Sequence, residues 1–104
     1  MDYSLQTINI KLSSIEQATL DKKMQRLQKH LHYPFVIHIV FAHDAHHLKG
    51  DVVTCKINVR QGKKVFHAER QGPTIADTLD EVTEALQREL EKDHDRRKDR
   101  HASA

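Results

Sequence analysis

The chain has 104 residues, 38% of them hydrophobic and 31% charged, so it is long enough for one small domain and too apolar for a disordered chain. Its net charge of +2 does not by itself indicate a nucleic-acid-binding protein, and no apolar run approaches the roughly 20 residues of a membrane-spanning helix. The beginning, MDYSLQTINIK, does not resemble a signal peptide, and Cys55, the one cysteine, has no internal disulfide partner. We therefore expect a cytoplasmic protein with no membrane partner.

The first third of the chain predicts a strand and then a helix. The strand is indicated by polar residues that alternate with Tyr3, Leu5 and Thr7. Ser13 and Glu16 have the spacing of a capping box, which predicts that a helix begins there. The apolar stripe of this helix comprises Leu20, Met24, Leu27 and Leu31. Pro34 is expected to end it.

Three strands are predicted next, at residues 35–42, 52–60 and 63–70, which alternate in character and are rich in β-branched residues. The segment HDAHHLKG after the first of them is expected to be a loop, and Gln61-Gly62 a tight turn. The side chains predicted to point inward are those of Val53, Cys55, Ile57, Val59, Phe66 and Ala68. The outward set is Thr54, Lys56, Asn58 and Arg60.

A second helix is predicted after Gly72-Pro73, because Thr74 with Asp77 three residues later indicates a helix start. Its apolar stripe comprises Ile75, Leu79, Val82, Leu86 and Leu90. The remaining sequence, DHDRRKDRHASA, has no apolar face, so we expect the helix to fray beyond Arg96. We predict one domain, residues 1–96, and a short, basic, disordered tail, residues 97–104.

The order β-α-β-β-β-α predicts an α+β fold, because two helical stripes and one half-apolar sheet bury their apolar faces best as two layers. We expect a four-stranded sheet with both helices packed on one face. No internal repeat or long linker divides the chain.

No sequence motif indicates catalysis or a cofactor site, so we expect neither enzymatic activity nor a small-molecule substrate. The cluster of His43, His46 and His47 is the best candidate for a metal site. Its H-x-x-H-H spacing matches no zinc pattern, and Cys55 is the only thiol in the chain. We therefore predict no metal site and assign Cys55 to the core.

Basic residues form a stronger pattern on the two helices. On the first helix they lie opposite the apolar stripe, at Lys22, Lys23, Arg26, Lys29 and His30. On the second they recur at a spacing of four, at Arg88, Lys92 and Arg96. Two such ridges side by side would match the phosphates of a folded RNA. Acidic residues in the first half of the second helix oppose this use there, at Asp77, Asp80, Glu81 and Glu84.

The chain resembles the ribosome hibernation promoting factor / ribosome-associated translation inhibitor family, also called the sigma-54 modulation protein family. The resemblance covers residues 3–96 and depends on INIKLSS, on KKMQRLQKHL and on FHAERQGPTIADTLDEVTEALQREL. Ala76 and Asp80 match the A-x-x-x-Asp core of the second helix in that family. The chain is most similar to the short, promoting form.

This resemblance implies a fold similar in topology to double-stranded RNA-binding domains. It implies binding to the small ribosomal subunit and its 16S rRNA, in the channel for messenger and transfer RNA, and inhibition of translation under stress or in stationary phase. The rRNA-binding residues it implies are Lys22, Lys23, Arg26, Lys29, Arg88, Lys92 and Arg96. Whether the bound ribosomes pair as dimers is left open. One departure is Ala85, where a lysine is common in the family.

Two other functions stay open at this point. One is a protein-binding regulator of transcription, of the sigma-54 modulation type, that uses the outward side chains of Thr54, Lys56, Asn58 and Arg60. The other is a metal-binding protein centred on His43, His46 and His47.

Overall fold

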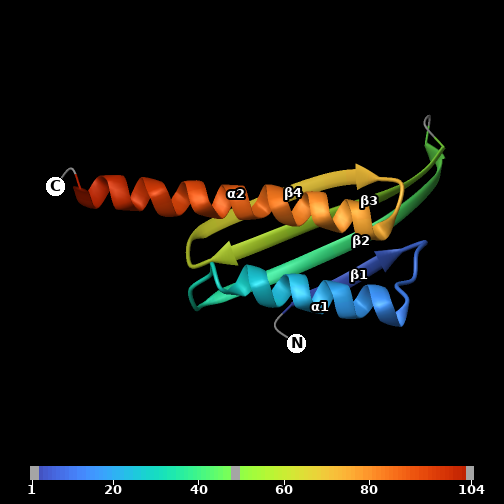
Figure 1. The fold of residues 1–104 in the computed structure, drawn as a ribbon, viewed down its shortest axis with the longest axis horizontal. Coiled ribbons are helices and arrows are strands. Elements are labelled where there is room, and N and C mark those ends of the chain that lie inside the picture. The colour runs from blue at the N-terminus through green and yellow to red at the C-terminus, as the bar shows by residue number, and fades with distance from the viewer. Residues whose placement is uncertain (1–2, 48–49, 103–104) are drawn as a thin grey trace.

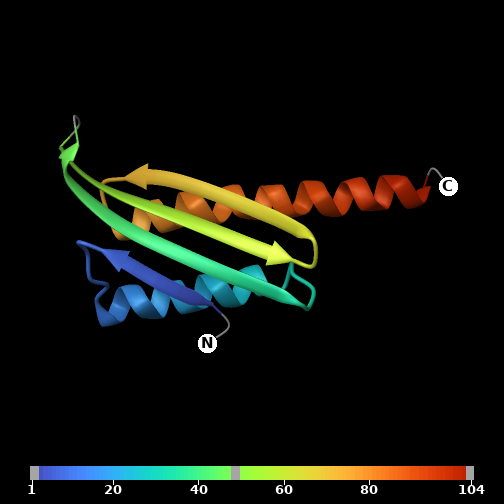
Figure 2. The ribbon, with the colours of Figure 1, turned by 180° about the vertical axis from the view of Figure 1, so that it is seen from behind.

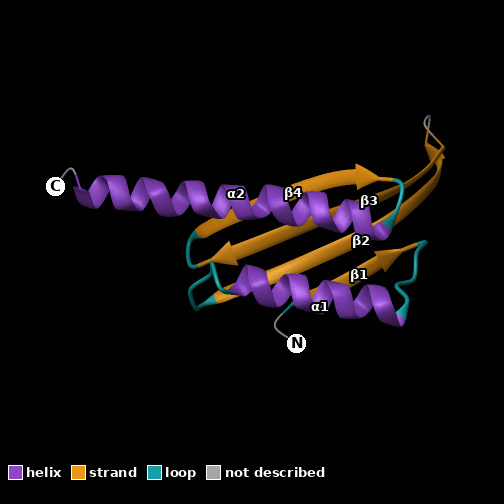
Figure 3. Cartoon of the chain, viewed as in Figure 1, coloured by secondary structure: helices purple, strands orange, loops and turns teal. Residues whose placement is uncertain are grey.

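The structure, a computed structural model, describes the backbone of residues 3–47 and 50–102 and the side chains of residues 3–45 and 50–95. Its elements are β1 (Ser4–Ile8), α1 (Ser14–Gln28), β2 (Phe35–His47), β3 (Gly50–Gln61), β4 (Lys64–Gly72) and α2 (Ile75–Ala102). The strands form one layer, and both helices lie on the same face of it (Figure 3). The predicted β-α-β-β-β-α fold is therefore confirmed.

The sheet has the order β1-β2-β3-β4. β1 is parallel to β2, because α1 carries the chain back between them, and the other two pairs are antiparallel hairpins. Seen from behind in Figure 2, the second face of the sheet is covered by no helix. We call this second face the open sheet face.

The loop predicted for HDAHHLKG is wrong over most of its length, because β2 continues to His47 and β3 begins at Gly50. Asp44 pairs with Val52, and His47 pairs with Gly50 after a shift of register. The polar composition suggested a loop, but pairing between the two strands continues past this shift of register, and Val53, at 6% exposure, belongs to the core.

The core lies between the sheet and the helices. Leu20, Met24 and Leu27 of α1 are buried, as are the predicted stripe residues of α2. Ala68 and Cys55 point inward as predicted, and Phe66 packs against the core while partly buried. Cys55 has no exposed surface, and its burial raises the pKa of the thiol to about 12.

α1 begins at the predicted capping box. The Ser13 hydroxyl accepts a hydrogen bond from the Glu16 amide at 3.2 Å, and the Glu16 carboxylate accepts one from the Ser13 amide at 2.8 Å. The helix ends at Gln28, earlier than the prediction from Pro34. Leu31 is nevertheless buried, because a tight turn after α1 returns it to the core.

A polar contact fastens α1 to β1. The Tyr3 hydroxyl donates to the Asp21 carboxylate and accepts from the Gln17 side-chain amide at 2.9 Å. Burial, and then the neighbouring Asp21 carboxylate, raise the pKa of Tyr3 to about 12. Asp21 is therefore engaged within the fold.

α2 begins as predicted at Thr74, whose hydroxyl accepts from the Asp77 amide at 3.1 Å. The buried Thr78 hydroxyl donates to the Thr74 carbonyl at 2.6 Å. A Cβ on Gly72 would lie 2.6 Å from that hydroxyl, so this tight entry into α2 requires glycine.

α2 continues to Ala102, beyond Arg96, where we expected fraying. Its end extends past the sheet in Figure 1. Residues 91–102 contain no glycine or proline that would end a helix. The helix therefore continues although this segment has no apolar face. No helix in the described part of the chain is long and apolar enough to cross a membrane.

Candidate nucleic-acid interface

The cations of α1 lie on its outer side. Leu20, Met24 and Leu27 bury one side of the helix, and Lys22 and Arg26 are exposed on the remainder. Lys29, the residue after Gln28, is exposed as well. None of these three cations forms an ion pair with the residues whose side chains are described. We call Lys22, Arg26 and Lys29 the α1 cationic face.

Lys23 has a different environment from its neighbours. Its ammonium lies 2.5 Å from the Asp80 carboxylate of α2, and its side chain is only 23% exposed. The pair joins the two helices across the groove between them. The structure thus places this predicted RNA-binding residue in an internal contact, and gives Asp80 a partner that the sequence did not reveal.

The groove between the helices carries mixed charge. Beside Lys23 it is a hollow of about 200 Å³, with Arg26 and Leu27 on the α1 side. The α2 side consists of Thr83, Glu84 and Gln87. A phosphate in this groove would approach Arg26 but also the Glu84 carboxylate. The groove itself is therefore a poorer anion site than the α1 cationic face.

Arg88 and Lys92 of α2 lie on the far side of that helix from α1. Arg88 and Lys92 line a hollow of about 300 Å³ together with Arg70 of β4. Arg88 follows the groove residue Gln87 by roughly 100° around the helix, which turns it away from α1. The Lys92 ammonium lies 3.8 Å from the Glu89 carboxylate. We call Arg70, Arg88 and Lys92 the α2–β4 cluster.

The six predicted residues whose side chains are described do not form the two adjacent ridges that we expected. Two groups result, the α1 cationic face and the α2–β4 cluster, with the groove and its carboxylates between them. Arg96 is within α2, but its side chain lies outside the described part of the structure. Ala85, where the family commonly has a lysine, is buried at 7% exposure on the side of α2 that faces β4. A lysine there would have to extend from this buried position to reach solvent.

Sequence reasoning missed Arg70. It follows Phe66 and Ala68 at a spacing of two, so the alternation that placed those residues on the helix side also places Arg70 there. Its guanidinium donates to the Glu69 carbonyl at 2.7 Å. The sequence signal that could have identified Arg70 was a basic residue at an inward-facing position near the end of a strand.

The open sheet face carries the outward residues that were predicted. Val36 and Val65 are 63% and 64% exposed, and both line a shallow hollow of about 340 Å³ with Arg60. His38 is 2.6 Å from the Ser4 hydroxyl, and His67 is 2.6 Å from the Asn58 side-chain oxygen. The Lys56 ammonium lies 3.9 Å from the Glu69 carboxylate.

The histidine cluster of the hairpin is only partly visible. The His43 ring lies 3.9 Å from the Asp51 carboxylate, and the side chains of His46 and His47 lie outside the described residues. Among the residues that are described, no three His, Cys, Asp or Glu side chains are placed to hold a metal ion.

Comparison with known proteins gives one family. The model of the family described as "Sigma 54 modulation protein / S30EA ribosomal protein" matches residues 3–98. No curated protein matches the chain.

Two solved structures share the fold. One is the N-terminal domain of Protein Y from Thermus thermophilus, with a TM-score of 0.70, 14% identity, and coverage of 86% of this chain and 94% of that one. The other is a ribosomal subunit interface protein from Coxiella burnetii, with a TM-score of 0.72, 18% identity, and coverage of 88% and 96%.

Proposed function

This chain belongs to the sigma 54 modulation protein / S30EA ribosomal protein family, and we propose that it binds the ribosome through the α1 cationic face. The observation that carries the proposal is that Lys22, Arg26 and Lys29 are exposed and have no ion-pair partner among the described side chains. Cations in this state can neutralise RNA phosphates without first breaking a contact within the protein.

The ribosomal partner we propose is the small subunit and its 16S rRNA. The helical layer would bind in the channel for messenger and transfer RNA and thereby inhibit translation, as a hibernation factor does under stress or in stationary phase. Phosphate contacts follow the shape of a folded RNA and do not read base edges, so the binding depends on the fold of the rRNA. This role requires no catalysis and no cofactor.

The α2–β4 cluster would supply a second and weaker contact. Arg88 and Lys92 are exposed, but Lys92 already lies near Glu89 and the outer surface of α2 is rich in carboxylates. Arg96 would extend this contact toward the end of the helix. We propose residues 1–96 as the ribosome-binding part of the chain and residues 97–104 as a short basic tail outside it.

A second candidate function is protein binding by the open sheet face, as in a regulator of the sigma-54 modulation type. The exposed apolar side chains of Val36 and Val65 favour it, because they flank Arg60 on a face that no helix covers. The two functions differ in their response to salt. Phosphate contacts weaken steeply as salt rises, whereas an apolar protein contact does not.

Sedimentation with purified small subunits across a range of salt concentrations tests the proposal. With about five phosphate contacts, log affinity should fall against log salt with a slope of roughly −4. Large subunits serve as the matched control and should retain much less protein. If the protein stays in the supernatant with every ribosomal fraction, it does not bind ribosomes; a flat salt response would instead favour the open sheet face.

A further inference from the structure

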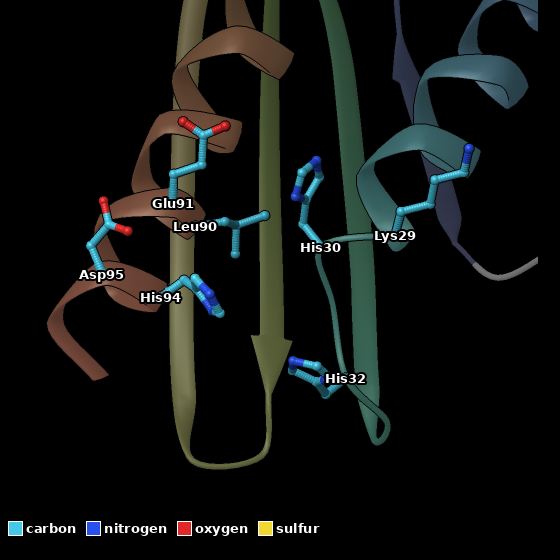
Figure 4. A pocket seen from close by; sticks show the side chains of 7 residues that line it. All are labelled: Lys29, His30, His32, Leu90, Glu91, His94 and Asp95. Atoms are coloured by element: carbon cyan, nitrogen blue, oxygen red, sulfur yellow. The ribbon is translucent and has the colours of Figure 1, made fainter. Parts of the chain in front are cut away.

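Three histidines line a hollow at the end of the interhelical groove. His30 and His32 follow the end of α1, and His94 comes from α2 (Figure 4). Together they line a hollow of about 250 Å³, which we call the histidine hollow. In Figure 4, Leu90 and His94 point from α2 toward the segment that carries His30 and His32. No predicted role of the chain accounts for this cluster.

The walls of the histidine hollow are fixed by the fold. The His30 amide donates to the Leu27 carbonyl at 3.0 Å, which continues the turn at the end of α1. The His32 amide donates to the Gln61 side-chain oxygen at 2.6 Å, which fastens this segment to the end of β3. Leu90 is 6% exposed and belongs to the core. A ligand would therefore enter a site whose backbone is already in place.

The chemistry of the lining narrows the class of ligand. Lys29 is the one lysine or arginine among the described residues of the lining, which also include the carboxylates of Glu91 and Asp95. This balance is unfavourable for a phosphate ion that makes no other contact in the hollow. Among the described side chains, no three His, Cys, Asp or Glu residues are placed here to hold a metal ion either. The imidazole rings and Leu90 instead offer flat and apolar surfaces, which suit a planar aromatic ligand.

We propose that the histidine hollow receives one unpaired nucleotide of RNA. The base stacks against the imidazole rings above Leu90, its amino group donates to a carboxylate at the α2 rim, and its phosphate lies at the Lys29 ammonium. This inference rests on the proposed function, since it specifies a single-stranded feature of the RNA that the helical layer binds.

Nuclear magnetic resonance of the intact chain tests this site without ribosomes. Adenosine 5′-monophosphate, added in the presence of a chelator, should cause saturating shifts of the backbone amides of residues 29–32 and 90–95. Uridine 5′-monophosphate should bind several-fold more weakly, because it offers a smaller stacking face. Adenosine without the phosphate should also bind more weakly, and Lys29→Gln should remove that difference.

Alanine variants separate the hollow from a general effect of histidine loss. A His32→Ala, His94→Ala double variant should bind adenosine 5′-monophosphate roughly tenfold more weakly, the loss expected for one stacking platform. His43→Ala, near the distant β2–β3 hairpin end, is the matched control and should leave the affinity unchanged. Absence of saturating shifts, or equal affinity in the wild type and the double variant, would overturn the inference.

The same double variant distinguishes this inference from the proposed function. With small subunits it should show lower affinity at every salt concentration but an unchanged salt slope, because stacking is less sensitive to salt than phosphate contacts are. A lower slope would mean that the histidines act as phosphate contacts, which contradicts the nucleotide site. Failure of the wild type to bind ribosomes while it binds the nucleotide would reject the proposed function and retain the hollow.

Discussion

α1 and α2 lie on the same face of one sheet (Figure 1). They differ in which charged side chains are engaged within the fold and which remain exposed. On α1 both acids are engaged within the fold, Glu16 in the capping box and Asp21 with Tyr3, whereas the cations of the α1 cationic face are exposed and unpaired among the described side chains. On α2 most acids are exposed, and Lys92 lies near Glu89. Within the described side chains of the two helices, only those of α1 therefore present a surface dominated by available positive charge.

This difference shows that a count of charges along the sequence is a poor measure of an anion-binding surface. The relevant quantity is the charge that remains after internal hydrogen bonds and ion pairs have formed. Lys23 illustrates it, because its ammonium is held by Asp80 while Lys22 next to it is exposed. The predictions below test whether the contrast between the helices governs binding and stability.

Charge reversal on α1 should have the largest effect. A Lys22→Glu, Arg26→Glu double variant should bind small subunits roughly a hundredfold more weakly and reduce the salt slope by about two, because two phosphate contacts are lost and repulsion is added. Lys23 is left unchanged, since a carboxylate there would face Asp80. Sedimentation gives the affinity, and circular dichroism checks the fold.

The matched control is Arg60→Glu with Lys63→Glu. It makes the same change in net charge on exposed residues of β3 and the β3–β4 turn, away from the helical layer. We expect a much smaller loss of affinity, reflecting only the long-range field. If the control loses as much as the α1 variant, either total charge or the open sheet face governs binding, and the α1 cationic face has no special role.

The same reversal on α2 should have a smaller effect. Arg88→Glu with Lys92→Glu should weaken binding roughly tenfold, because the neighbouring carboxylates already reduce the potential at these positions. Sedimentation against the same small subunits allows a direct comparison with the α1 variant. A loss equal to or greater than that of the α1 variant would make the α2–β4 cluster the principal contact.

The helix starts provide a comparison of stability. Glu16→Ala should lower the free energy of unfolding by about 1 kcal/mol, because it removes the hydrogen bond to the Ser13 amide and a carboxylate at the helix N-terminus. Asp77 holds the equivalent position of α2, and its side chain makes no such bond. Asp77→Ala should therefore cost only about 0.3 kcal/mol, the helix-dipole contribution. Urea unfolding measures both, and equal losses would show that the capping box adds nothing.

Most of the fold could be predicted from local patterns in the sequence. The capping box at Ser13, the alternation around Cys55 and the helical stripe through Leu86 each depend on neighbours within a few residues, and all three are confirmed. The β2–β3 hairpin was underestimated because pairing between strands keeps polar residues in a strand, and this pairing is invisible in a single segment.

The arrangement of the candidate site could be predicted less well from the sequence. The exposure of Lys22 and Arg26 followed from their position opposite the apolar stripe. The Lys23–Asp80 pair depends on how closely α1 and α2 approach, and no periodicity within either helix specifies that distance. The histidine hollow has the same origin, since its lining comes from two segments far apart in the sequence.

Release of Lys23 should have the smallest effect on binding, with a direction opposite to the charge reversals. Asp80→Asn removes the carboxylate 2.5 Å from the Lys23 ammonium, and should strengthen binding to small subunits about two- to threefold while steepening the salt slope by up to one. Stability should fall by less than about 1 kcal/mol, because the Asp80 side chain is 56% exposed and solvent weakens the pair.

Asp77→Asn makes the same charge change on an exposed carboxylate that holds no lysine, and it should strengthen binding less. Sedimentation of the two variants side by side decides the matter. If they gain affinity equally, the benefit comes from the reduced negative charge of α2 alone. If only Asp80→Asn gains, the interhelical ion pair keeps part of the cationic surface of α1 out of reach of RNA.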